Sequence, residues 1–220
     1  MNIAIVLYDR FTALDAVGPY EVLSRLPGAT VTFAAEKPGP VTTDNGMLQI
    51  LASASLQEIP APEIILVPGG PGEVAARAGG EVLQWLRQAH RTSTWTTAVC
   101  TGSLILAEAG LLEGVPASTH WLAMGELERL GARAVPERVV FDGKIVTAAG
   151  VSAGIDMALA LAQRIAGDTV AQAIQLGIEY DPQPPLDAGS PERAPAEVVE
   201  MLRASSRFGE PEPREASGAR

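Results

Sequence analysis

Short apolar runs of strand length alternate along this chain with segments of helical periodicity, and this alternation limits the folds that the chain can adopt. The clearest run is 63–67 (EIILV), which ends in the proline and glycine cluster PGGPG. An apolar run of this length is typical of a strand buried on both faces, as in a parallel sheet. Strands that alternate with helices therefore predict an α/β domain whose mostly parallel central sheet has helices on both faces.

The spacing of apolar residues and the turn residues between them predict the individual elements. Strands are expected at 2–8, 29–35, 63–67, 94–99, 115–119, 138–141 and 145–149, and a hairpin is expected within 40–51 around Asn45-Gly46. Helices are expected at 13–26, 80–91, 102–111, 153–165 and 169–179. We expect Pro19 early in the first helix, where its missing N–H costs little.

The composition changes after Tyr180, where the chain becomes rich in proline. Three parts are expected: an α/β domain over 1–180, a proline-rich segment with a short helix packed on that domain over 181–205, and a disordered polar tail over 206–220. No internal repeat is found in the domain.

Charge and composition exclude several classes of function. The formal net charge is −10 and the 16 basic residues are scattered, which argues against binding to nucleic acid or to an anionic membrane. No apolar run reaches the roughly 18 residues of a membrane span, and the first residues lack the basic start of a signal peptide, so a cytoplasmic protein is expected. One cysteine and two histidines exclude an internal disulfide and a cysteine-rich zinc site, and no metal or other cofactor is expected.

Three features that could carry chemistry follow predicted strands. They are Asp15 after the first strand, Gly70 after the central strand and Cys100 after the next one. Ligands of open α/β sheets bind at the carboxyl ends of strands. Ala98 and Gly102 flank the cysteine as the small residues that a nucleophile elbow requires, and the N-terminus of helix 102–111 would favour its thiolate.

The residues around this thiol allow defined roles. The N–H groups of Gly70 and Thr101 could form an oxyanion hole, and Asp15 could act as general acid and base. His120 is the imidazole best placed to assist. Each residue also has a purely structural explanation: a buried cysteine that fills space, a glycine turn, a helix cap and a satisfied histidine.

The segments LDAVGPYEVL, ILVPGGPG, AVCTGSLILAEAGLL, ASTHW and GVSAGIDMALAL resemble the ThiJ/PfpI superfamily, a flavodoxin-like group related to class I glutamine amidotransferases. Within that superfamily the chain is most similar to the isonitrile hydratases. The resemblance implies a flavodoxin-like three-layer sandwich and a homodimer that acts on a small molecule. It also implies Cys100 as nucleophile, Asp15 as the acid beside it, Thr101 as the residue after the elbow and Gly70 as an oxyanion donor.

The same resemblance suggests a reaction and its alternatives. An isonitrile hydratase would convert an isonitrile to an N-substituted formamide through a covalent thioimidate, without a cofactor. Peptidase-like relatives have a histidine directly after the nucleophile, where this chain has Thr101. The alternatives are another cysteine-dependent hydratase or hydrolase, such as a glyoxalase-like enzyme, and a redox-sensing or ligand-binding protein without turnover. The THW pattern also occurs in AraC-type regulators, which would need a further helix-turn-helix domain.

Overall fold

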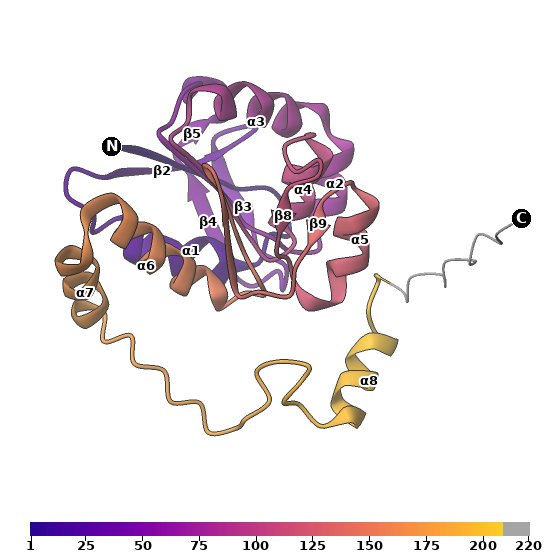
Figure 1. The fold of residues 1–220 in the computed structure, drawn as a ribbon. Coiled ribbons are helices and arrows are strands. Elements are labelled where there is room, and N and C mark those ends of the chain that lie inside the picture. Colours follow the sequence, from indigo (N-terminus) through magenta and orange to yellow (C-terminus); the bar gives the residue numbers. More distant parts are fainter. Residues whose placement is uncertain (209–220) are drawn as a thin grey trace, which may run out of the picture. The chain divides into compact units, whose positions relative to one another are not determined.

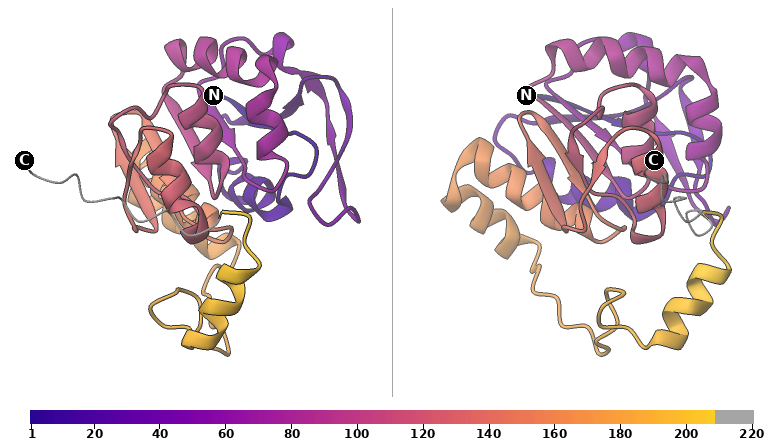
Figure 2. Two further views of the ribbon diagram at one scale, coloured as in Figure 1. Left: turned by 90° about the vertical axis from the view of Figure 1, so that its right-hand side faces the viewer. Right: turned by 45° about the vertical axis from the view of Figure 1, so that its right-hand side comes forward.

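The computed structural model describes residues 1–208, and its first unit, Met1–Asp181, has three layers. A seven-stranded sheet lies between two groups of helices (Figures 1 and 2). Helices α1 and α6 pack together on one face, and α2, α3, α4 and α5 cover the other. The predicted three-layer α/β fold is confirmed.

The central sheet contains seven strands in the order β10-β11-β7-β6-β1-β2-β5. Their bounds are β1 (Asn2–Val6), β2 (Thr30–Ala35), β5 (Ala54–Ser55), β6 (Ile64–Val67), β7 (Trp95–Val99), β10 (Val139–Asp142) and β11 (Ile145–Ala148). Every neighbouring pair is parallel except β10 and β11, which are antiparallel. Two small sheets lie outside it, formed by β3 (Gly39–Thr42) with β4 (Gln49–Ala52) and by β8 (Pro116–Ala117) with β9 (Arg133–Ala134).

The strand order reverses direction between β1 and β6. The chain leaves β1 towards β2 on one side, and it leaves β6 towards β7 on the other. All four residues of β6 are buried, as expected for the central strand. A reversal of this kind leaves space for a ligand outside the carboxyl ends of the two strands. The loops after β1, β6 and β7 meet at this edge.

The helices of the first unit are α1 (Ala13–Leu23), α2 (Glu73–Ala78), α3 (Gly80–Thr92), α4 (Gly102–Glu108), α5 (Met124–Arg129), α6 (Ala153–Ala166) and α7 (Asp168–Gly177). Two short 3-10 helices, η1 (Leu56–Glu58) and η2 (Trp121–Ala123), lie between them. The sequence did not predict α2 and α5. Each has six residues, which is too short for helical periodicity to show.

The expected position of Pro19 in the first helix was wrong. Pro19 lies inside α1, which begins at Ala13, and not in its first turn. Packing explains why a residue without an N–H is tolerated there. A Cβ atom at Gly154 of α6 would lie 3.0 Å from Pro19 Cγ, so the proline ring fits against a glycine of the neighbouring helix.

The second unit begins at Pro182 and contains α8 (Ala196–Ala204), close to the helix expected there. Its packing on the α/β domain stays a prediction. Most of the tail expected to be disordered, 206–220, lies outside the described residues. Within 1–208, no helix is long and apolar enough to cross a membrane.

The close contact between α1 and α6 gives a prediction about stability. Gly154→Leu should lower the free energy of unfolding by about 3 kcal/mol, because the new side chain would overlap Pro19 and Val99. The matched control is Gly177→Leu in α7, where a Cβ atom meets nothing within 4 Å and the change should stay within about 1 kcal/mol. Urea unfolding measures both, and equal losses in the two variants would contradict this packing.

Candidate active site

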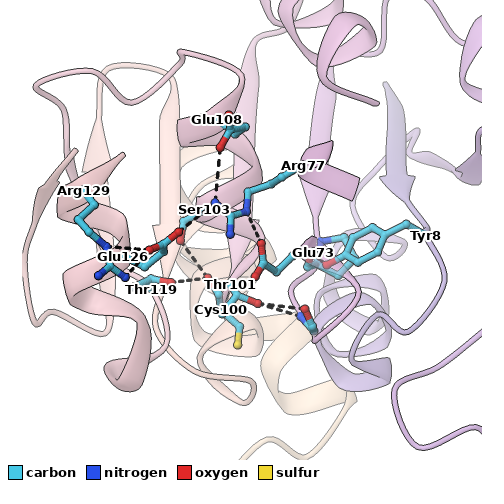
Figure 3. A network of polar contacts seen from close by, with 12 residues as sticks. Tyr8, Glu73, Arg77, Cys100, Thr101, Ser103, Glu108, Thr119, Glu126 and Arg129 are labelled. Carbon is cyan, nitrogen blue, oxygen red and sulfur yellow. Dashed lines mark hydrogen bonds and ion pairs between the residues drawn. The ribbon is translucent and has the colours of Figure 1, made fainter. Parts of the chain in front are cut away.

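Cys100 occupies a strained turn between β7 and α4. Its φ angle is 56°, in the left-handed region that residues other than glycine rarely adopt. Gly102 makes the turn possible, because a Cβ atom there would lie 2.2 Å from the carbonyl oxygen of Val67. Two hydroxyl groups, those of Ser103 and Thr119, each donate to the Cys100 carbonyl at 3.0 Å (Figure 3). The turn therefore has the tight geometry of a nucleophile elbow.

Asp15 reaches the same place from the first turn of α1. Its side chain is fully buried, and the N–H of Gly69 donates to Oδ2 at 2.8 Å. Gly69 has no room for a side chain, because a Cβ atom would lie 2.9 Å from Oδ2 and 2.5 Å from the Thr101 nitrogen. The second oxygen, Oδ1, is buried, and no hydrogen bond reaches it from the described residues. Among the described residues, this oxygen is a buried acceptor whose hydrogen-bonding capacity is unused.

Two backbone N–H groups and one hydroxyl near Cys100 act to lower the pKa of its thiol. The N–H groups of Val151 and Thr101 and the Thr101 hydroxyl all stabilise its thiolate. The N–H of Gly70, expected as a direct oxyanion donor, instead donates to the Thr101 hydroxyl at 2.9 Å. Gly70 therefore affects the thiol indirectly, because it holds the Thr101 hydroxyl.

Burial dominates the electrostatics of the site. It raises the pKa of Asp15 to about 7, although the Gly69 N–H and the Cys100 thiol act in the opposite direction. Burial, and next the negative charge of Asp15, raise the pKa of Cys100 to about 12, against the donors of Val151 and Thr101. The sequence led us to expect that the dipole of the following helix would favour the thiolate. That helix has only seven residues, and desolvation outweighs its effect.

The two pKa values define what the pair can do. Between pH 7 and 12, Asp15 and Cys100 together hold one proton and one negative charge. When the proton lies on the carboxyl, the pair consists of a thiolate nucleophile beside a carboxylic acid. Such a pair can form a bond to carbon and deliver a proton in one encounter.

His120 has a structural role at the start of η2. Its Nδ1 accepts a hydrogen bond from the Leu122 N–H at 3.3 Å and so caps η2. A Cβ atom at Gly150 would lie 2.9 Å from its Cδ2, so the ring packs against that turn. Burial lowers the pKa of His120 and keeps the ring neutral. Within 1–208, no described hydrogen bond or charge interaction joins it to Cys100 or Asp15.

A separate cavity lies at the carboxyl edge of the sheet, away from Cys100. It measures about 640 Å³ and lies beyond Gly72, with Arg10, Lys37 and Val74 among its lining residues. Cys100 and Asp15 do not line it. In the part of the chain that the structure describes, no group of three or more histidine, cysteine or carboxylate side chains could hold a metal ion.

Sequence reasoning missed part of the site. The N–H of Val151, the Thr119 hydroxyl and the bond from Gly69 to Asp15 were not assigned roles. Val151 could have been found, since GVSAG follows a predicted strand that ends at this edge. Thr119 could not, because only the tertiary fold brings it to the Cys100 carbonyl.

The fold and this elbow place the chain among α/β proteins with a cysteine at the carboxyl edge of the sheet. The chain belongs to the DJ-1/PfpI family, which matches residues 1–164. It is 41% identical over 203 residues to an isonitrile hydratase from Pseudomonas putida, a match that covers 92% of this chain and 89% of that protein. The resemblance to the ThiJ/PfpI superfamily is thereby confirmed.

Two further relatives show how widely this domain is used. A ThiJ/PfpI family protein from Pseudomonas syringae has a similar solved structure, with a TM-score of 0.88 and 37% identity over 91% of this chain and 85% of that one. The HTH-type transcriptional regulator CdhR of Pseudomonas aeruginosa is 32% identical over 60% of this chain, but the match covers only 40% of the regulator.

The raised pKa of Asp15 predicts a dependence of stability on pH. A folded-state pKa of about 7 against an ordinary 3.8 means that burial of this carboxyl costs nothing below about pH 4 and destabilises the fold as pH rises to 7. Asp15→Asn should therefore be more stable than wild type at pH 8, by up to about 4 kcal/mol, and should match it near pH 4.

Urea unfolding at the two pH values measures this difference. Asp142→Asn, at the exposed last residue of β10, controls for the loss of one charge. A pH-independent difference between Asp15→Asn and wild type would mean that Asp15 does not titrate in this range.

Proposed function

We propose that this protein is an isonitrile hydratase, an enzyme that adds water to an isonitrile and releases an N-substituted formamide. The observation that carries the proposal is the buried Cys100 and Asp15 pair, which holds one proton at neutral pH. The terminal carbon of an isonitrile must receive both a nucleophile and a proton. The identity to the isonitrile hydratase of Pseudomonas putida over most of both chains supports the same reaction.

In the first step, the Cys100 sulfur forms a bond to the terminal carbon of the isonitrile. The proton shared with Asp15 moves to that carbon and leaves the carboxyl ionised. The product is a thioimidate, in which the former isonitrile carbon is bonded to sulfur, hydrogen and nitrogen. The N–H of Val151 and the Thr101 groups stabilise the thiolate before the attack.

In the second step, the ionised Asp15 takes a proton from water while the oxygen adds to the thioimidate carbon. Asp15 passes that proton to the nitrogen. The carbon–sulfur bond then breaks, the oxygen becomes the formamide carbonyl, and its proton returns to the Cys100 and Asp15 pair. We assign the water to the side of Oδ1, the carboxyl oxygen that accepts no hydrogen bond from the described residues. One water is consumed and the pair is restored.

The alternatives have less support in the site. A redox-sensing cysteine is typically exposed and has a low pKa, whereas Cys100 is 5% exposed and burial raises its pKa to about 12. A glyoxalase-like reaction would suit a cation near the thiol to hold a carboxylate-bearing substrate. No lysine or arginine is among the described contacts of Cys100 or Asp15.

We further propose a cytoplasmic homodimer. A lone thiol with no disulfide suits a reducing compartment. The start of α1 and the adjacent hairpin expose Leu14, Met47 and Leu51, which a second copy could cover. The net charge of −10 favours a small-molecule substrate over nucleic acid or an anionic membrane. Light scattering after size exclusion should give twice the mass of the chain, and a monomer would contradict the dimer.

Steady-state kinetics with an aryl or alkyl isonitrile test the reaction. Cys100→Ala should lose more than about 10³-fold in kcat, because the covalent thioimidate cannot form without the thiol. Asp15→Asn should lose about 10² to 10⁴-fold, since Asn can accept the Gly69 N–H but cannot transfer a proton. The exposed Asp142→Asn variant serves as the control.

Formamide is measured directly, and mass spectrometry of quenched enzyme detects the thioimidate on Cys100. Full activity of Cys100→Ala would exclude covalent catalysis. Absence of formamide with wild-type enzyme and a series of isonitriles would refute the proposed function and favour another substrate.

A further inference from the structure

A cluster of charged side chains lies behind the elbow and is not used in the reaction. Arg77 of α2 contacts three carboxylates: Glu73 in its own helix at 2.5 Å, Glu126 of α5 at 3.1 Å and Glu108 of α4 at 3.5 Å (Figure 3). Arg129 contacts only the Glu126 member of the cluster, at 2.5 Å. One guanidinium group thus joins three helices on the same face of the sheet.

Arg77 and Glu73 are the buried members of this cluster. The side chain of Glu73 is completely buried, and that of Arg77 is 15% exposed, whereas Arg129 is 59% exposed. Removing an ion pair from water costs about as much as the attraction returns, so a buried pair is a poor source of stability. Such a pair does, however, fix the orientation of the groups attached to it.

Backbone hydrogen bonds connect Glu73 to the residues beside the Cys100 thiol. Glu73 follows the loop after β6, and its N–H donates to the carbonyl of Gly70 at 3.0 Å. The N–H of the same glycine donates to the Thr101 hydroxyl at 2.9 Å, and that hydroxyl donates to the Gly70 carbonyl at 3.5 Å. Thr101 in turn stabilises the Cys100 thiolate. The Gly70 peptide is therefore held on one side by the first residue of α2 and on the other by the elbow.

We propose that the buried pair of Arg77 and Glu73 is a positioning device that sets the activity of the Cys100 thiol. The pair ties the start of α2 to α4 and α5, and this fixes the Gly70 peptide against the Thr101 hydroxyl. Arg77 and Glu73 touch neither the sulfur nor the substrate in this role. The expected effect of this pair on turnover rests on the hydratase reaction proposed above.

The positioning role depends on how tightly the Gly70 peptide is confined. Gly70 has a φ of 128°, and a Cβ atom there would lie 2.5 Å from the Thr12 nitrogen, so this peptide is confined by the backbone of the loop after β1 as well. A small rotation of α2 would move the Gly70 N–H off the hydroxyl. Thr101 would then lose its hydrogen bonds with the Gly70 peptide, and its N–H and hydroxyl would no longer be held in place beside the thiol whose pKa they lower.

The test removes the pair without leaving a buried charge. The double variant Glu73→Gln/Arg77→Met keeps the approximate volume of both side chains. The single variant Arg77→Lys keeps the charge but not the planar group that reaches three carboxylates. It should therefore show a smaller loss of thiol reactivity than the double variant. Arg129→Met is the matched control, since it removes an arginine of the same cluster that contacts neither Glu73 nor Arg77.

Two readouts are needed. The rate of alkylation of Cys100 by iodoacetamide, followed from pH 7 to 10 on folded protein, requires no substrate. In the double variant this rate should fall about tenfold at each pH, which corresponds to a rise of about one unit in the thiol pKa. With an isonitrile, kcat should fall at least tenfold, and KM should change less than about threefold. Arg129→Met should match wild type in both.

The outcomes separate this inference from the proposed function. Wild-type alkylation rates and wild-type kcat in the double variant would overturn the positioning role. Equal losses in Arg129→Met would show that the charge of the whole cluster matters and would also overturn it. If wild-type enzyme hydrates no isonitrile, the function fails, but the alkylation rates still decide the role of the pair. Circular dichroism and urea unfolding check that each variant is folded during the assays.

Discussion

The site depends on the burial of a carboxyl and a thiol against one another. Burial makes ionisation of both Asp15 and Cys100 costly, and the negative charge of Asp15 makes ionisation of Cys100 costlier still, so the thiol keeps its proton when the carboxyl ionises. The surrounding backbone is arranged around this constraint. Gly69 leaves space for the Asp15 carboxyl, Gly102 leaves space for the turn, and Cys100 accepts a strained φ angle. The sheet supplies the common edge at which these loops meet.

Much of the fold and part of the site could be predicted from the sequence. The buried strands and longer helices were recognisable because their apolar periodicity extends over enough residues. Asp15, Gly70 and Cys100 could be placed at one edge, because the carboxyl ends of parallel strands converge there. The short helices α2 and α5 have too few residues to show helical periodicity. The direction of a backbone N–H, such as that of Val151, does not depend on a pattern of side chains and so could not be predicted.

The electrostatic expectation failed for a different reason. A helix that begins after a cysteine is visible in the sequence, and its dipole favours the thiolate. The depth at which that cysteine lies depends on the packing of every element around it, and burial decides the pKa here. Gly70 shows the same limit. Its proximity to the thiol was predictable, but the partner of its N–H depends on the side-chain rotamer of Thr101.

The low exposure of Cys100 has a consequence for the working life of the protein. In the absence of substrate the sulfur is almost inaccessible and is largely protonated, so peroxides and metabolic electrophiles find little thiolate to attack. A low-pKa cysteine on an open surface is more susceptible to both. Burial of the thiol therefore lowers its reactivity and, with it, the rate at which oxidants and electrophiles destroy it.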